Sequence, residues 1–153
     1  MTLRSMLVVL ASIVLSASWA PEAAAQIAVI VNPRNPITDL SLEELRRLYL
    51  GRTTAFRQNQ PVTLLEQAEM RGPFYRVALG MNESRVRRHW IGIVFSGETA
   101  TPPKTIAPVG ELKRAVARNT GAIAFVELVA ADPTVKVLTI NGFHPGDAGY
   151  PLR

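Results

Sequence analysis

Two short apolar runs constrain the fold of this chain more than any other feature. Ile27–Val31 (IAVIV) and Ala122–Val126 (AIAFV) contain no polar residue and no alternation of polar and apolar side chains. Continuous runs of this kind are typical of central strands that are covered on both faces. Helical patterns lie between the strand candidates. The sequence therefore predicts an α/β fold with a mostly parallel sheet and helices on both faces.

The remaining elements follow from capping and turn signals. Ser41 and Glu44 fit a capping box at the start of a helix that ends before Gly51. Asn82 is a predicted N-cap for a later helix. Further strands are expected at Pro61–Glu66 and Val135–Ile140, and further helices at Pro73–Leu79 and Gly110–Arg118. The tail after Ile140 is rich in glycine and proline and is expected to be irregular.

The helix after Asn82 carries the one tryptophan outside the N-terminal segment. Its predicted buried stripe consists of Val86, Trp90, Ile93 and Val94. Arg85, Arg87, Arg88 and His89 are expected on the solvent side. Trp90 is therefore predicted to be a core residue and not a platform for a ligand.

The N-terminus has the pattern of a secretion signal. Arg4 precedes the apolar run Met6–Leu15, and Ala23-Ala24-Ala25 supplies small residues for cleavage after Ala25. The alternative is an uncleaved anchor, but the apolar run is too short to span a bilayer. Residues 1–25 are therefore expected to be removed, and residues 26–153 to form a single domain in the periplasm.

Composition excludes several classes of function. There is no cysteine, which excludes disulfides, thiolate metal sites and thiol catalysis. The formal net charge is +5, and only three of the 17 basic residues are lysine. Arginine suits carboxylates and phosphates, although dispersed arginines are also common on ordinary solvated faces. A periplasmic location offers no obvious nucleic-acid target, so no nucleic-acid partner is expected.

No catalytic constellation is visible in the sequence. His89 and His144 are the two histidines, one on a predicted solvated helix face and one in the tail. Glu66 and Glu69 could form a carboxylate pair, but acidic residues also occur before helices because they favour the positive N-terminal end. Hydrolase, zinc, dinucleotide and P-loop motifs are absent. The chain is therefore expected not to be an enzyme and to have no metal or cofactor.

Anion recognition by backbone amides is the kind of function that these exclusions leave open. The turn from Glu66 to Gly72 leads into a predicted helix, whose free amides and dipole could bind an oxyanion. Arg71 would add a charged fork. Helix starts of this kind occur in every α/β protein.

An ordered set of segments resembles the phosphate ABC transporter substrate-binding protein family. The set runs through Val29–Phe56 (VIVNPRNPITDLSLEELRRLYLGRTTAF), Arg71–Gly80 (RGPFYRVALG), Arg87–Gly97 (RRHWIGIVFSG), Pro102-Pro103 and Val116–Val126 (VARNTGAIAFV). Phe56 stands where the family often has tryptophan, and Ala124-Phe125 where it has Gly-Tyr. The resemblance implies one lobe of a type II periplasmic binding protein, in a short, single-lobe form.

The sequence departs from that family in two ways. Members have two lobes and about twice this length in the typical case. Members that bind phosphate carry Ser-Gly-Thr where this chain has Met70, Arg71 and Gly72, and an arginine near the position of Glu66. A carboxylate repels phosphate. The resemblance therefore implies fold, export and a binding role more firmly than it implies phosphate.

These observations predict a periplasmic, non-enzymatic binding protein linked to anion ABC transport or sensing. The candidate ligand is a small anion such as phosphate, and the candidate protein partner is a membrane transporter or sensor. The expected contacts, at the strand ends, are Asn32, Thr38, Gln67, Arg71 and Thr120. The alternative is an envelope protein-interaction module that has lost solute binding. The sequence leaves the oligomeric state open.

Overall fold

The structure is a computed structural model that describes residues 26–153. The predicted signal segment, residues 1–25, lies outside the described residues. Within the described part, no helix combines the length and the apolar character that a bilayer span requires.

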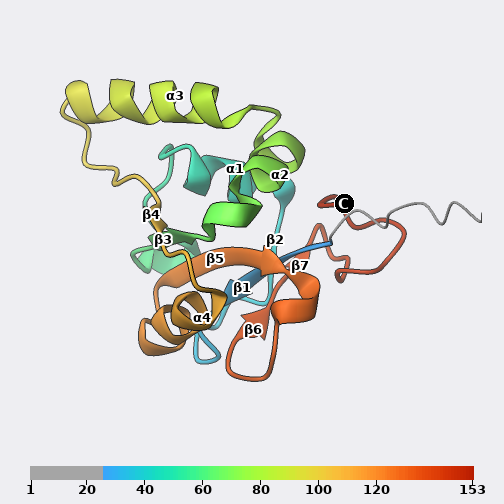
Figure 1. The fold of residues 1–153 in the computed structure, drawn as a ribbon. Coiled ribbons are helices and arrows are strands. Elements are labelled where there is room, and N and C mark those ends of the chain that lie inside the picture. Colours follow the sequence, from blue (N-terminus) through green and yellow to red (C-terminus); the bar gives the residue numbers. More distant parts are fainter. Residues whose placement is uncertain (1–25) are drawn as a thin grey trace, which may run out of the picture.

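A five-stranded sheet in the order β4-β3-β5-β1-β6 forms the centre of the fold (Figure 1). The strands are β1 (Ile27–Val31), β3 (Thr63–Glu66), β4 (Lys104–Thr105), β5 (Ala122–Glu127) and β6 (Lys136–Val137). Strand β3 is parallel to β4 and β5, whereas β1 is antiparallel to β5 and β6. Four strands thus share one direction and β1 is reversed, which confirms the mostly parallel sheet.

Strands β1 and β5 form the buried middle of this sheet. They pair over their full length, from Ile27 opposite Glu127 to Val31 opposite Ile123. Every residue of β1 is buried, and so is β5 up to Val126. Because successive side chains point to opposite faces, Val29 lies in one core and Ala28 in the other. The continuous apolar runs are therefore explained by burial on both faces.

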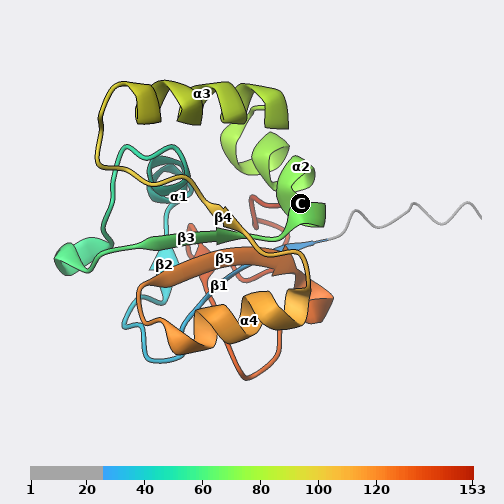
Figure 2. The same cartoon turned by 60° about the vertical axis from the view of Figure 1, so that its left-hand side comes forward.

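Helices cover the two faces of the sheet, as Figure 2 shows. Helix α4 (Val109–Arg118) packs on one face through Leu112 and Val116, which are both fully buried. The other face is covered by α1 (Leu42–Tyr49) and by α2 (Arg71–Phe74) with the π-helical turn Tyr75–Leu79 that continues it. Helix α3 (Glu83–Phe95) lies outside these helices. The predicted helices on both faces are confirmed.

Three aromatic rings fill the core between α1, α2 and β5. Phe74 stacks on Phe125 with ring centroids 3.8 Å apart, and Tyr49 meets Phe74 edge-on at 4.9 Å. The Tyr49 hydroxyl donates a hydrogen bond to the Leu65 carbonyl at 3.0 Å. Burial raises the pKa of Tyr49 well above its usual range, so this hydroxyl keeps its proton. The cluster thus ties α2 to strands β3 and β5.

Helix α3 lies at the outer side of this layer, where Asn82 caps it by accepting from the Arg85 amide at 2.9 Å. Val86, Trp90 and Ile93 are buried as expected. The placement of Val94 in the same stripe was wrong, because its side chain is 56% exposed. Val94 lies at the margin of the helical stripe, and the body of the protein does not extend far enough to cover it. His89 is half-buried and bonds to the Leu50 carbonyl at 2.8 Å, which corrects its expected place on the solvent side.

The segment Val135–Ile140 forms two short strands instead of the single strand that was expected. Strand β6 joins the main sheet, whereas β7 (Thr139–Ile140) pairs in parallel with β2 (Asp39–Leu40) in a separate small sheet. Leu138 between them is fully buried, and its amide donates to the Val29 carbonyl at 2.9 Å. The chain therefore changes sheets at this buried residue.

The tail after Ile140 has no helix or strand, as expected, but it is tied to the core. Tyr150 and Leu152 are buried. The Tyr150 hydroxyl donates to the Ile27 carbonyl at 2.7 Å, and the Ile27 amide donates to the Leu152 carbonyl at 3.4 Å. The tail thus closes the beginning of β1.

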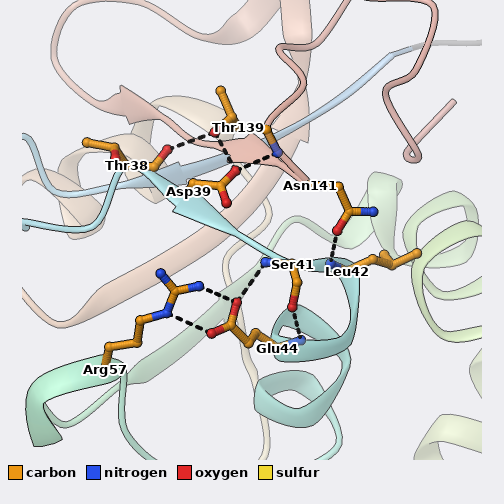
Figure 3. Close-up of polar contacts among 9 residues, drawn as sticks. Thr38, Asp39, Ser41, Leu42, Glu44, Arg57, Thr139 and Asn141 are labelled. Atoms are coloured by element: carbon orange, nitrogen blue, oxygen red, sulfur yellow. Dashed lines mark hydrogen bonds and ion pairs between the residues drawn. The ribbon is translucent and has the colours of Figure 1, made fainter.

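Figure 3 shows the predicted capping box at the start of α1. The Ser41 hydroxyl accepts from the Glu44 amide at 3.1 Å, and Glu44 accepts from the Ser41 amide at 2.8 Å. Arg57 also binds both Glu44 oxygens at 2.7 Å. The bonds from Arg57 lower the pKa of Glu44 from 4.5 to about 2. A carboxylate whose pKa is lower in the folded state than in the unfolded state stabilises the fold at pH values above its unfolded-state pKa. This stabilisation is lost as the pH falls through its folded-state pKa.

Glu44→Gln should therefore lower the melting temperature at neutral pH, and the difference from wild type should disappear as the pH approaches 2. Glutamine still serves a capping box, so the substitution isolates the charge. Circular dichroism melts between pH 2 and 7 measure the difference. Glu43→Gln is the control, since it removes only an exposed pair with Arg47 and should have little effect. A pH-independent difference for Glu44→Gln would contradict the assignment.

Trp90→Ala should destabilise the fold by about 3–5 kcal/mol, because it leaves a cavity beneath α3. Urea unfolding followed by circular dichroism measures the change. Phe95→Ala on the same helix is the matched control. Phe95 is 87% exposed, so its removal should change stability by no more than about 0.5 kcal/mol. Equal losses for the two variants would show that Trp90 is not a core residue.

Candidate functional site

A polar cluster lies where β3 ends, and a buried carboxylate forms its centre. Glu66 is the last residue of β3 and is only 4% exposed. Strand β3 runs between β4 and β5, so its end is enclosed by neighbouring chain. A buried carboxylate is costly unless hydrogen bonds and opposite charges compensate it. Its partners therefore define the site.

Three side chains satisfy Glu66. The Tyr75 hydroxyl donates to Oε2, and the Thr105 hydroxyl donates to Oε1 at 2.7 Å. Arg71 Nη1 reaches Oε1 at 3.4 Å. These partners come from the π-helical turn, from β4 and from the start of α2. The cluster thus joins the continuous helical segment Arg71–Leu79 to β4, which is distant in sequence.

Tyr75 is a permanent donor in this cluster. Burial, reinforced by the hydrogen bond to Glu66, raises the pKa of Tyr75 well above its usual range. The phenol therefore remains protonated in neutral solution, and its hydroxyl donates its hydrogen bond to Glu66. Tyr75 is neither a nucleophile nor a general base under these conditions.

Arg71 lies between two carboxylates. In addition to Glu66, its Nε atom is 3.4 Å from Glu83 Oε2, an ion pair that lacks hydrogen-bond geometry. Its Nη1 also donates to Thr105 Oγ1 at 3.3 Å. The arginine is partly exposed, so a solute can approach it. Any solute anion must nevertheless compete with two carboxylates for the same charge.

A groove of about 580 Å³ opens beside the cluster. Its lining includes Tyr75 and the charged side chains Glu66, Arg71, Glu83 and Arg87. The rest of the lining is mostly apolar and comes from α3 and the loop before β4: Val86, Trp90, Ile91, Val94, Phe95, Pro102 and Pro103. The groove is therefore amphipathic, since both charged and apolar side chains line it.

The structure brings two of the five predicted contacts to this end of the sheet, namely Gln67 and Arg71. Gln67 is buried, and its Nε2 atom donates to Glu69 Oε2 at 2.9 Å. Its Oε1 atom is also buried and has no hydrogen-bond partner among the described residues. The Arg71 amide already donates to the Ala68 carbonyl, and α2 is a single four-residue turn. Arg71 therefore offers its side chain, rather than an extended row of free helix amides.

The other three predicted contacts lie elsewhere. Asn32 follows the reversed strand β1 and so emerges at the opposite edge of the sheet, where its buried Nδ2 donates to the carbonyls of Val116 and Ala117 at the end of α4. Thr120 precedes β5 at that same edge, and its carbonyl accepts from Asn35 and Gln60. The expectation that these residues share one edge with Gln67 and Arg71 is thus corrected by the direction of β1.

Thr38 immediately precedes strand β2 of the small β2–β7 sheet, and Figure 3 shows it beside Asp39 and Thr139. Its side chain is exposed, and its carbonyl accepts from the Thr139 amide at 3.0 Å and the Thr139 hydroxyl at 3.2 Å. Asp39 next to it accepts from Thr139 and Gly142. These contacts hold the two short strands together.

The polar groups of the cluster are suited to holding charge. Glu66 bonds to Tyr75, Thr105 and Arg71, whereas Glu69 bonds to Gln67, so the two carboxylates that could have formed a pair have separate partners. Among residues 26–153, no group of three or more His, Cys, Asp or Glu side chains is placed to hold a metal ion. The described contacts within the cluster are ion pairs and hydrogen bonds.

Sequence reasoning missed Tyr75 and Thr105. Tyr75 lies within the helix expected at Pro73–Leu79, and a tyrosine that follows Arg71 by one helical turn is a signal that its hydroxyl could return to the same site. Thr105 gave no such signal. It is 39 residues from Glu66 in sequence and reaches it only because β4 pairs with β3.

No protein family model matches the sequence. Solved structures with a similar fold include a protein from Clostridium perfringens, described as a phosphate ABC transporter substrate-binding protein with bound phosphate (TM-score 0.63, 20% identity). They also include an ABC-type phosphate transport receptor from Vibrio cholerae (TM-score 0.55, 21% identity) and PstS from Borrelia burgdorferi (TM-score 0.61, 13% identity).

Each of these matches covers 78% of this chain, but only 46%, 48% and 49% of the respective neighbour. The chain therefore has a fold similar to about half of a phosphate-type substrate-binding protein. At these identities the similarity shows the fold and nothing finer.

Tyr75→Phe should destabilise the protein by about 1.5–3 kcal/mol, because it removes a hydrogen bond to a buried charged group. Tyr150→Phe is the matched control. It removes a hydrogen bond from a buried tyrosine to the neutral Ile27 carbonyl, and should cost only about 0.5–1.5 kcal/mol. Chemical denaturation at neutral pH compares the two. A smaller loss for Tyr75→Phe than for Tyr150→Phe would contradict the central place of the Tyr75–Glu66 hydrogen bond in the cluster.

Proposed function

We propose that this chain is an exported, non-enzymatic binding protein of the phosphate-binding type, which serves anion ABC transport or sensing from the periplasm. The observation that carries the proposal is the fold, which is similar to about half of several solved phosphate transport receptors. The secretion pattern of residues 1–25 supports export and cleavage after Ala25.

The proposed contact for the anion is the end of β3. Arg71 supplies the charged fork, and the neighbouring Gln67 supplies a polar side chain. The proposed contact does not include Asn32, Thr38 or Thr120. Asn32 is bonded to the end of α4, Thr38 is bonded to the small sheet, and Thr120 lies at the opposite edge of the main sheet. Glu66 and Glu83 compensate Arg71, so the affinity of the isolated chain for phosphate is expected to be weak.

Phosphate should bind the wild-type protein with a Kd no tighter than about the millimolar range. Glu66→Gln should bind phosphate more tightly, since it removes one of the two carboxylates that compete for Arg71. Thermal shift with phosphate measures the effect, because a ligand that binds only the folded state raises its stability in proportion to ln(1 + [L]/Kd).

Two controls make this test specific. Sodium chloride at the same ionic strength separates binding from screening. Arg71→Ala, alone and combined with Glu66→Gln, should abolish the response to phosphate. Micromolar binding to the wild-type monomer would contradict the weak site, and the absence of a phosphate-specific shift in Glu66→Gln would overturn the proposed contact.

A second candidate function is a protein-interaction module of the envelope that has lost solute binding. The observation that favours it is the groove beside the cluster, whose apolar wall is exposed on α3. Glu66 compensates the charge of Arg71, so the cluster does not offer an uncompensated positive charge to an anion. This arrangement also fits a lobe that no longer captures an anion. If neither wild type nor Glu66→Gln responds to phosphate, this candidate gains support over solute binding.

A further inference from the structure

Helix α3 carries a line of exposed side chains on the face that is turned away from the core. At intervals of four, three and four residues, which keep to one side of a helix, this face carries Ser84, Arg88, Ile91 and Phe95. All four are exposed, and the buried residues of α3 lie on the opposite side. Figures 1 and 2 both place α3 at the outside of the molecule. We call this surface the outer face of α3.

The apolar side chains of this surface gather in the second half of the helix. Ile91 is 48% exposed, Val94 next to the line is 56% exposed, and Phe95 is 87% exposed. Among the described residues, the other large apolar side chains with such exposure are Val129 and Phe143, and neither lies on α3. Neighbouring exposed apolar side chains of this kind mark interaction sites in soluble proteins.

The first half of the helix is basic. Arg88 lies on the outer face, Arg85 and Arg87 flank it, and all three are exposed. Among residues 26–153, none of these arginines has an ion-pair partner. Positive charge that the protein itself does not compensate attracts an anionic surface.

The carboxylates at the two ends of α3 have other contacts. Glu83 is 3.4 Å from Arg71 Nε. Glu98 lies past the turn at Gly97, accepts from the Ser96 hydroxyl at 3.1 Å, and lines a separate hollow with residues 51–55. The outer face of α3 therefore combines positive charge with apolar side chains and carries no carboxylate.

We propose that the outer face of α3 docks on an anionic lipid surface. The three arginines bind headgroup phosphates, while Ile91 and Phe95 enter the boundary between the headgroups and the acyl chains. Arg88 and Phe95 are about 10 Å apart along the helix axis, which is comparable with the depth of about 5–10 Å that interfacial helices reach.

Charge and shape together favour a lipid surface over other anionic partners. The arginines require an anionic partner. The apolar side chains protrude from a single outer helix, and a fluid headgroup layer accommodates them without a complementary pocket. Arginine suits the boundary as well, because its apolar stem lies against the acyl region while its guanidinium stays among the phosphates. The proposal goes beyond the anion contact at the end of β3 and requires neither Gln67 nor Arg71.

Binding to vesicles tests the proposal. The protein used begins at residue 26, because the apolar run Met6–Leu15 would itself enter a bilayer, and residues 26–153 contain the whole described core. It should co-sediment with vesicles of mixed phosphatidylglycerol and phosphatidylcholine but not with pure phosphatidylcholine. Binding should weaken as sodium chloride is added. Absence of binding to the mixed vesicles, or equal binding to both kinds, would overturn the proposal.

Removal of the arginine charges tests the electrostatic part. Arg85→Gln, Arg87→Gln and Arg88→Gln should each weaken binding by about fivefold, as expected for one cation near an anionic membrane surface. Arg118→Gln is the matched control, since Arg118 is exposed at the end of α4 on the other side of the sheet. It should leave binding nearly unchanged. Equal losses for Arg118→Gln and the α3 variants would show that overall charge drives binding, and would exclude the outer face of α3.

Phe95 tests the apolar part. Phe95→Ser should weaken binding by about tenfold, because an exposed phenyl ring no longer leaves water. Val129→Ser is the matched control and should bind as wild type does. Val129 is 84% exposed, but it lies in the turn Leu128–Ala130, whose Ala130 carbonyl accepts from Lys113 of α4.

Fluorescence distinguishes insertion from adsorption. The emission of Phe95→Trp should shift to shorter wavelength when phosphatidylglycerol vesicles are added, whereas that of Val129→Trp should not. Trp90 is present in both variants and in wild type, so the wild-type spectrum is the baseline. An unshifted Phe95→Trp spectrum on bound protein would overturn the insertion of this side chain.

Other occupants of the outer face give different results. A second copy would produce concentration-dependent sedimentation without lipid that Phe95→Ser abolishes, and an acidic protein partner would leave the vesicles unbound. Either result would overturn the proposal. Phosphate and sodium chloride at equal ionic strength should weaken vesicle binding equally, so failure of the anion contact leaves this test intact. A greater loss with phosphate would place the headgroups at Arg71 instead of α3.

Discussion

The reversed strand β1 is the constraint on which the rest of the structure depends. It lies between β5 and β6, is antiparallel to both, and is buried on both faces. Its direction decides which loops meet. The residues after β1 emerge beside the start of β5, whereas the residues after β3 emerge at the other end of the sheet. The polar residues after β1 therefore make structural hydrogen bonds, whereas the polar residues after β3 lie at an edge that solute can reach.

At the accessible edge, burial of Glu66 sets the chemistry. A carboxylate at this depth requires several donors, and Tyr75, Thr105 and Arg71 provide them. The same contacts fasten α2 and β4 to the end of β3. They also use much of the charge that Arg71 could offer to a solute. Arg71 therefore helps to hold the cluster together while two carboxylates compensate its charge.

The sequence predicted elements better than their arrangement. The apolar runs of β1 and β5, the capping box of Ser41 and Glu44, and the burial of Trp90 all follow from local patterns. The direction of β1 does not, because a fully buried strand has the same composition whichever way it runs.

The site was accessible to prediction only in part for the same reason. Gln67 and Arg71 are close in sequence to the end of β3, so local reasoning placed them correctly at one edge. Thr105 reaches Glu66 through strand pairing over 39 residues, which no local pattern encodes. Val94 shows the limit of helical periodicity, which identifies the side of a helix but not how far the neighbouring body extends.

The closure of β1 by the tail has a consequence for how the chain acquires its structure. The first strand has no partner until residues 122–137 are available, and its start is completed only by Tyr150 and Leu152. Contacts between such distant parts of a chain slow folding, because a long loop must close before any of them forms. A polypeptide emerging from the ribosome would therefore lack the pairing of β1 until residues 122–137 have emerged.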